Sequence, residues 1–262
     1  MKHITKLVLP VAGLGKRLLP LTKKIPKNLV KANGKPMIEY VLEEAVLSGI
    51  KEIILIVNPL HRKQFESYLV SAKKKFSNLK FHIREQATPG GNGHAIVQAY
   101  NLVEREPFAV RFCDDIILNQ PPVLGTLIKL FDTYRGPVLL LERVPQSMVS
   151  RFGVVAVKKI KDRIYQINKI IEKPKQSQAP SNLTIVGGYV LTPDVIRNLK
   201  SVADTLPVIA DDALPLAVAL QIELIVGGKV YGWEFNGKRL DCGTLEKLKK
   251  TEEFLKNWTP PH

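Results

Sequence analysis

The first chemically suggestive feature of the chain is a glycine turn, which follows a short apolar run at residues 7–11. Gly13 and Gly15 permit positive φ and a close approach of the backbone to a ligand, and successive amides in such a turn can point at an anion. Basic side chains follow at Lys16, Arg17, Lys23, Lys24 and Lys27. The pattern indicates a polyphosphate-binding loop. A plain turn beside a solvated basic face is the alternative.

Two common phosphate-binding motifs do not match this loop. A Walker loop requires glycine where Pro10 stands and Ser or Thr where Arg17 stands. The dinucleotide-binding fingerprint requires a third glycine at the position of Leu18. What remains is Gly-x-Gly-x-Arg, followed ten residues later by the lysine of Pro26-Lys27.

A second glycine-rich segment, 86–95, begins with Gln86 and contains Gly91. A glutamine amide carries both a donor and an acceptor, as reading the edge of uracil or thymine requires. The glycines would let a base or sugar lie against bare backbone. A flexible loop before a helix is the alternative. We expect His94 to be a core or loop residue, because no second histidine has the spacing of a metal ligand.

Acidic residues stand at the ends of two predicted strands. Asp114 and Asp115 close a strand at 107–113, where α/β enzymes place catalytic carboxylates, although an acidic pair could equally be a turn or a helix cap. Glu172 and Lys173 follow an apolar run. The acid could accept hydrogen bonds from sugar hydroxyls while the lysine meets a phosphate, and a surface ion pair is the alternative.

The elements that would position these residues alternate between strand and helix in the first half of the chain. Apolar periodicity predicts helices at 36–48, 60–75 and 93–103, and strands at 52–57, 80–84 and 107–113. Such alternation indicates a parallel sheet with right-handed crossovers. In such sheets ligands gather at the carboxyl ends of the strands.

The second half of the chain contains more strands. They are predicted at 138–144, 154–157, 164–171, 183–191 and 230–235, before a terminal helix at 244–256 that Thr244 could cap. Gly187 and Gly188, in mid-strand, mark a bulge or a close backbone approach. We expect a single domain over 1–262: an α/β, Rossmann-like fold with a mixed, mostly parallel sheet flanked by helices, and a small added β region in the second half.

Composition limits the possible partners and compartment. Lysine and arginine outnumber the acids 39 to 24, a net charge of +15 that favours anionic partners. We recognise no nucleic-acid-binding motif, no apolar run of membrane-spanning length and no signal peptide. Cys113 and Cys242 offer neither a disulfide framework nor zinc spacing. We expect a cytoplasmic protein that binds small molecules, with neither nucleic acid nor membrane as a partner.

Three segments together resemble the sugar-1-phosphate nucleotidylyltransferases. The first is the loop AGLGKRLLPLTKKIPK, the second is EKPKQSQAPSNLTIVGGYVLTP from Glu172 onward, and the third is GKRLDCG around Asp241. The resemblance extends over almost the whole chain. It implies the nucleotidyltransferase fold, with a nucleotide-binding half at 1–113 and a sugar- and metal-binding half at 114–262.

The resemblance also implies a reaction and roles for particular residues. The reaction is transfer of a uridylyl group from UTP to glucose 1-phosphate, which gives UDP-glucose and pyrophosphate. The implied catalytic residues are Arg17, Lys27 and Asp114; the nucleotide-binding residues are Ala12, Gly13, Leu14, Gly15, Gln86 and Gly91; the sugar-phosphate-binding residues are Gly153, Glu172, Lys173 and Gly187. Asp114 and Asp241 would hold Mg²⁺, which takes oxygen ligands and keeps several waters.

Some positions depart from the usual pattern of the uridylyl-transferring members. They are Lys16, Asn28, Gly34, Gly188 and the segment 207–211 before Asp212-Ala213. These changes leave three readings open: a uridylyltransferase, a thymidylyl- or other sugar-1-phosphate nucleotidylyltransferase, and a catalytically weakened regulatory paralogue. Family members commonly assemble, so the resemblance also implies a homo-oligomer.

Overall fold

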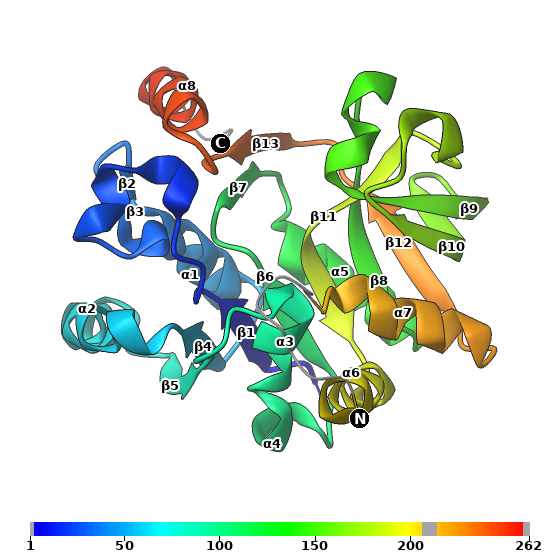
Figure 1. The fold of residues 1–262 in the computed structure, drawn as a ribbon, viewed down its shortest axis with the longest axis horizontal. Helices are drawn as coiled ribbons and strands as arrows, with labels where there is room; N and C mark the ends of the chain where they lie inside the picture. Colours follow the sequence, from blue (N-terminus) through cyan, green and yellow to red (C-terminus); the bar gives the residue numbers. More distant parts are fainter. Residues whose placement is uncertain (1–2, 206–213, 259–262) are drawn as a thin grey trace.

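The computed structural model describes residues 3–205 and 214–258, which contain a nine-stranded central sheet (Figure 1). The strand order is β5 (Lys80–Glu85), β4 (Glu52–Val57), β1 (Lys6–Pro10), β6 (Phe108–Arg111), β11 (Leu183–Leu191), β8 (Val138–Arg143), β12 (Val230–Glu234), β10 (Ile164–Glu172) and β9 (Gly153–Lys161). Only β11 and β10 run against the other strands. The predicted mixed, mostly parallel sheet is confirmed.

Helices cover both faces of this sheet. They are α1 (Met37–Leu47), α2 (Arg62–Lys75), α3 (Gly91–Val97), α4 (Tyr100–Val103), α5 (Val123–Tyr134), α6 (Pro193–Thr205) and α7 (Leu216–Ile225). Because side chains alternate along a strand, Ile53 and Leu55 of β4 pack with α1, α2 and α5, whereas Ile54 and Ile56 pack with α3, α6 and α7. A strand covered on both faces must be almost entirely apolar, as β4 is after Glu52.

A small two-stranded ribbon connects the C-terminal segment to the N-terminal loop. Strand β7 (Asp115–Leu118) pairs antiparallel with β13 (Lys238–Asp241), and Asp115 lies opposite Asp241. Behind the ribbon a separate apolar core joins Leu18, Ile116 and Leu240 to the terminal helix α8 (Leu245–Lys256). A second ribbon, β2 (Lys31–Ala32) with β3 (Lys35–Pro36), lies on the same side of the molecule (Figure 1).

Several element boundaries differ from the sequence predictions. The predicted helix at 93–103 begins earlier, at Gly91, and is divided into α3 and α4. A 3₁₀ turn (Pro59–His61), whose N-cap Asn58 accepts a hydrogen bond from the Leu60 amide at 2.9 Å, precedes α2. Helices α5, α6 and α7 and the ribbon strands were not predicted.

The predicted irregularity at the paired glycines of β11 is confirmed. The register of β11 against β8 shifts between Ile185 and Tyr189, so Gly187 and Gly188 lie at an irregularity of the pairing. Within the described residues, none of the helices combines the length and the apolar character needed to cross a membrane. The division of the domain into halves at 113/114 remains a prediction.

The cap of α8 provides a test of the fold. Thr244 accepts a hydrogen bond from the Lys247 amide at 3.3 Å. Thr244→Ala should lower the free energy of unfolding by about 1 kcal/mol, because an amide at the helix start loses its partner. Urea denaturation would measure the change. Thr133→Ala, in the last turn of α5, is the control and should cost clearly less; equal losses would contradict a capping role.

Candidate active site

A cleft of about 480 Å³ opens beyond the carboxyl ends of β1, β6 and β10. Both halves of the chain line it. Eleven of the predicted site residues contribute: Ala12, Gly13, Leu14, Lys27, Gln86, Gly91, Asp114, Gly153, Glu172, Lys173 and Gly187. Gly15, Arg17 and Asp241 are not among the residues that line it. For β1 and β6 the parallel topology explains the convergence, because the loops that follow parallel strands meet at one edge of the sheet. Strand β10 runs against them, and its end contributes Glu172 and Lys173.

Gly15 supports the catalytic candidate Lys27. Gly15 has a φ of +68°, and a Cβ atom there would lie 2.9 Å from the Cβ of Lys27 and 2.9 Å from a methyl of Thr22. The residue must therefore be glycine for both conformation and space. The Lys27 ammonium donates to Oδ2 of Asp114 at 2.5 Å, and this bond holds the lysine against the Asp114-Asp115 pair.

The two aspartates predicted to bind a metal lie on neighbouring chain segments. The Cys242 amide donates to the Asp114 carbonyl at 2.9 Å, immediately beyond the β7–β13 ribbon. The Gly243 amide donates to Oδ1 of Asp241 at 2.7 Å, and the Lys247 ammonium pairs with Oδ2. Arg17 is also near this turn, because a Cβ on Gly243 would lie 3.7 Å from its guanidinium nitrogen. Asp241 and Arg17 thus lie close to the same turn at Gly243, and neither lines the cleft.

The donor set suits a hard cation. It consists of carboxylate oxygens, and the described residues contain no group of three His, Cys, Asp or Glu side chains that could hold a metal ion. A site built on Asp114 and Asp241 would leave most coordination positions to water or phosphate. This is the usual arrangement for Mg²⁺ and differs from the closed protein cages of structural zinc sites.

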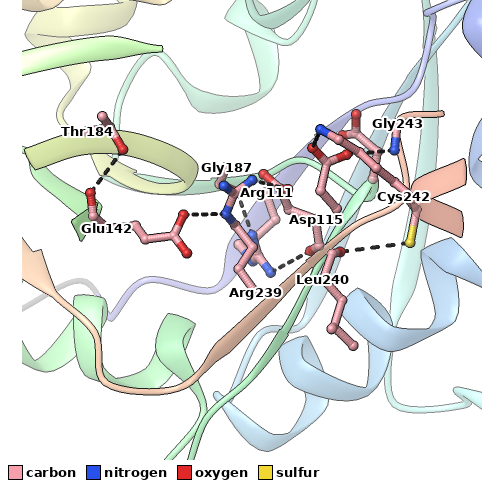
Figure 2. A network of polar contacts seen from close by, with 12 residues as sticks. Arg111, Asp115, Glu142, Thr184, Gly187, Arg239, Leu240, Cys242 and Gly243 are labelled. Carbon is pink, nitrogen blue, oxygen red and sulfur yellow. Dashed lines mark hydrogen bonds and ion pairs between the residues drawn. The ribbon is translucent and has the colours of Figure 1, made fainter. Parts of the chain in front are cut away.

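A largely buried ionic network includes Asp115, the residue after Asp114 (Figure 2). Arg239 donates to Asp115 Oδ1 at 3.0 Å and to Glu142 Oε2 at 2.6 Å. Fully buried Arg111 donates to the Gly187 carbonyl at 2.6 Å and pairs with Glu44 at 3.1 Å. Burial raises the pKa of the Asp115 carboxyl to about 6, the Asp114 carboxylate adds to the rise, and Arg239 opposes it.

The predicted base-reading loop has a specific internal arrangement. Gln86 is 6% exposed, and its amide nitrogen donates to the Gly91 carbonyl at 3.1 Å and lies 3.0 Å from Nδ1 of His94. His94 therefore helps to fix the Gln86 amide, a role that sequence spacing did not predict. Gly91 has a φ of +91°, which explains the glycine at the start of α3.

The opposite wall carries the residues predicted to bind the sugar phosphate. Lys173, directly after β10, has a φ of +44° and its amide donates to the Phe152 carbonyl at 3.0 Å. Such a left-handed conformation is costly for a lysine and is often found at functional sites. A Cβ on Gly153 would lie 3.1 Å from Glu172 Oε2, and one on Gly187 would lie 3.1 Å from Asp115 Oδ2. Both glycines therefore permit close packing against acidic side chains.

Several lining residues were missed from the sequence. Leu216, Ala217 and Leu220 of α7 form an apolar wall, and the Leu216 amide donates to Oδ1 of Asn92 at 2.9 Å, which ties this wall to α3. No sequence motif identifies such residues, because leucine and alanine are common in any hydrophobic core. The departures at 207–211 and the pair Asp212-Ala213 fall outside the described residues.

Comparisons with known proteins show the family of the chain. The chain belongs to the nucleotidyl transferase family, whose sequence profile matches residues 6–257. It is 34% identical to the UTP–glucose-1-phosphate uridylyltransferase of Pseudomonas aeruginosa, over 96% of this chain and 95% of that protein. It is 35% identical to the enzyme of the same name from Bacillus subtilis, over 95% of this chain and 89% of that protein.

Solved structures give the same picture. A crystal structure of UDP-glucose pyrophosphorylase complexed with UDP-glucose superposes with a TM-score of 0.86 at 30% identity, covering 97% of this chain and 98% of that one. A UTP-bound enzyme from Acinetobacter baumannii has a TM-score of 0.81 at 28% identity, covering 96% of this chain and 93% of that one. The predicted nucleotidyltransferase fold is confirmed.

The raised pKa of Asp115 predicts a pH dependence of stability. Its contribution should be fully present below the ordinary pKa of 3.8 and should be lost as the pH rises through about 6, because the folded chain binds the proton more tightly. Urea denaturation in metal-free buffer would give the free energy of unfolding of wild type minus that of Asp115→Asn. We expect this difference to fall with rising pH, and to stay flat for Asp162→Asn. A rise with pH would mean that Arg239 keeps Asp115 ionised.

Proposed function

We propose that the protein transfers a uridylyl group from UTP to glucose 1-phosphate, giving UDP-glucose and pyrophosphate. The supporting observation is the cleft itself, whose lining combines a glycine loop and Gln86 with Glu172, Lys173 and the Lys27–Asp114 pair. The names of the relatives point to the same substrates. A cleft of this volume is within the usual range for small-molecule sites.

The reaction requires alignment and charge neutralisation. An oxygen of the sugar phosphate attacks the α-phosphorus of UTP, the bond from that phosphorus to the bridging oxygen breaks, and pyrophosphate leaves with the electron pair. A phosphomonoester has a second pKa near 6, so the attacking oxygen is already charged at neutral pH and no general base is needed. Positioned cations therefore supply most of the protein's contribution.

Each wall of the cleft receives a role in this proposal. Amides of Ala12, Gly13 and Leu14 would hold the triphosphate, with Arg17 and Gly15 at the edge of the same loop. Gln86 would read the uracil edge against Gly91. On the other wall, Glu172 would accept hydrogen bonds from the sugar, Lys27 and Lys173 would bracket the phosphates, and backbone at Gly153 and Gly187 would face the sugar. These roles stay predictions.

We further propose Mg²⁺ as the metal, held by Asp114 and Asp241 with water and phosphate oxygens. When bound, the ion would neutralise developing charge on the α-phosphate. Two contacts support this proposal: the Cys242 amide donates to the Asp114 carbonyl, which brings the segments of the two aspartates together, and the Gly243 amide orients Asp241. The implied homo-oligomer also remains a prediction.

A substrate panel tests the proposed function. Purified protein with MgCl₂ would be given UTP, dTTP, ATP or CTP with glucose 1-phosphate or other sugar 1-phosphates, and pyrophosphate release would be followed. We expect the highest kcat/KM for UTP with glucose 1-phosphate. Preference for dTTP would identify a thymidylyltransferase. Tight UTP binding without pyrophosphate release from any pair would identify a non-catalytic paralogue and refute the proposal.

Asp114→Asn should lower kcat by about 100-fold or more, because the variant removes a carboxylate ligand of the proposed Mg²⁺, the ion that would neutralise charge on the reacting phosphates. The fold should be kept, since the Asp114 side chain is 32% exposed and the main-chain bond to Cys242 is unaffected. Steady-state pyrophosphate release measures the effect. Asp132→Asn, at an exposed position of α5, is the matched control. Unchanged turnover of Asp114→Asn would exclude a direct role.

A further inference from the structure

Each of the two aspartates assigned to the metal is already paired with a lysine ammonium. Asp114 pairs with Lys27, which also lines the cleft. Asp241 pairs with Lys247, a residue that the sequence did not single out and that has no role in the function proposed above. The charges of both aspartates are therefore balanced by lysine side chains of the protein itself, one from the N-terminal loop and one from α8.

Lys247 lies at a position where the helix dipole disfavours a lysine. It is the third residue of α8 after the cap Thr244, so its charge lies in the first turn. The positive end of the helix dipole disfavours a cation there. The partner that compensates is Asp241, whose carboxylate lies six residues earlier on β13. The pair connects the start of α8 to the end of the β7–β13 ribbon.

Both oxygens of Asp241 are engaged in this arrangement. Oδ1 accepts the Gly243 amide at 2.7 Å, and Oδ2 accepts the Lys247 ammonium. A main-chain amide cannot leave without unfolding the turn, whereas an ammonium on a four-carbon stem can swing away. The Lys247 side chain is 36% exposed, so water would solvate the released charge. Oδ2 is thus the oxygen that a divalent cation could reach, and Lys247 occupies it in the absence of the cation.

We propose that Lys247 is a tethered counter-ion that competes with the divalent cation for Asp241 and must release Oδ2 when the cation binds. This inference rests on the metal site of the proposed function. It has a consequence for the order of binding: the site disfavours the cation alone, and a triphosphate offers a new anionic partner for the displaced ammonium. Cation and nucleotide would therefore bind with positive coupling.

The test measures metal binding without turnover. Binding of Mn²⁺ alone would be followed by electron paramagnetic resonance at about pH 8, where carboxylates are ionised. The variants are Lys247→Met, Lys250→Met and Asp241→Asn. Lys250 is the matched control, because it lies one turn further along α8, loses the same charge on substitution and pairs with Glu246 at 2.6 Å instead of Asp241. Circular dichroism would confirm that each variant is folded.

We expect Lys247→Met to bind Mn²⁺ about five times more tightly than wild type, the size expected for removing one competing ion pair at a partly exposed site. Lys250→Met should match wild type, and Asp241→Asn should bind more weakly. Unchanged or weaker binding by Lys247→Met, with Asp241→Asn still impaired, would overturn the inference and leave the metal site standing. Unimpaired binding by Asp241→Asn would overturn both.

A second measurement uses the wild-type protein and does not depend on a variant folding. The rate at which an amine-reactive reagent labels each lysine can be followed by mass spectrometry with and without Mg²⁺. Release from Asp241 should raise the labelling rate of Lys247 several-fold, because an ammonium that no longer contacts a carboxylate is more accessible to the reagent. The rate at Lys250 should stay constant. Equal rates at Lys247 with and without Mg²⁺, at concentrations that saturate the site, would contradict release.

Discussion

The antiparallel pairing of β7 with β13 is the constraint on which the site depends. It brings Asp241, near the C-terminus, opposite Asp115 and next to Asp114 in the middle of the chain. The ribbon is held from behind by an apolar core that includes Ile116 and Leu240, together with α8. A short two-stranded ribbon is not stable alone. The C-terminal helix therefore contributes to the site through packing.

Charge pairing organises the site more than it stabilises the fold. Buried ion pairs recover little net energy, because desolvation offsets the Coulomb attraction. Arg239 nonetheless joins Asp115 on β7 to Glu142 on β8, and its guanidinium lies 5.2 Å from the ring centroid of Phe152, which lines the cleft. One side chain thus fixes the acidic segment relative to the opposite wall. The benefit of such a network is position, which suits a reaction that needs alignment.

Sequence patterns predicted the elements whose signal is local. The apolar run of β4, the periodicity of α1 and the cap Thr244 each depend on neighbouring residues, and each appears close to its predicted bounds. Glycine-rich loops were also recognisable, because few other residues permit positive φ. Strands β7 and β13 were missed since each is four residues long and pairs across more than a hundred residues. Helix α7 was missed because it is apolar nearly all round, so no amphipathic pattern marks it.

The same distinction applies to the site residues. Motifs identified Lys27, Asp114 and Glu172, to which the proposal assigns the chemistry. They did not identify the supporting contacts of His94 with Gln86 or of Arg239 with Asp115. A supporting residue needs only to reach its partner in space, so its position in the sequence is free. In this protein the supporting contacts carry charge as well as shape. Some of the many lysines of this basic chain therefore pair with acids inside the site. Lys27 and Lys247 each neutralise an aspartate in the absence of substrate.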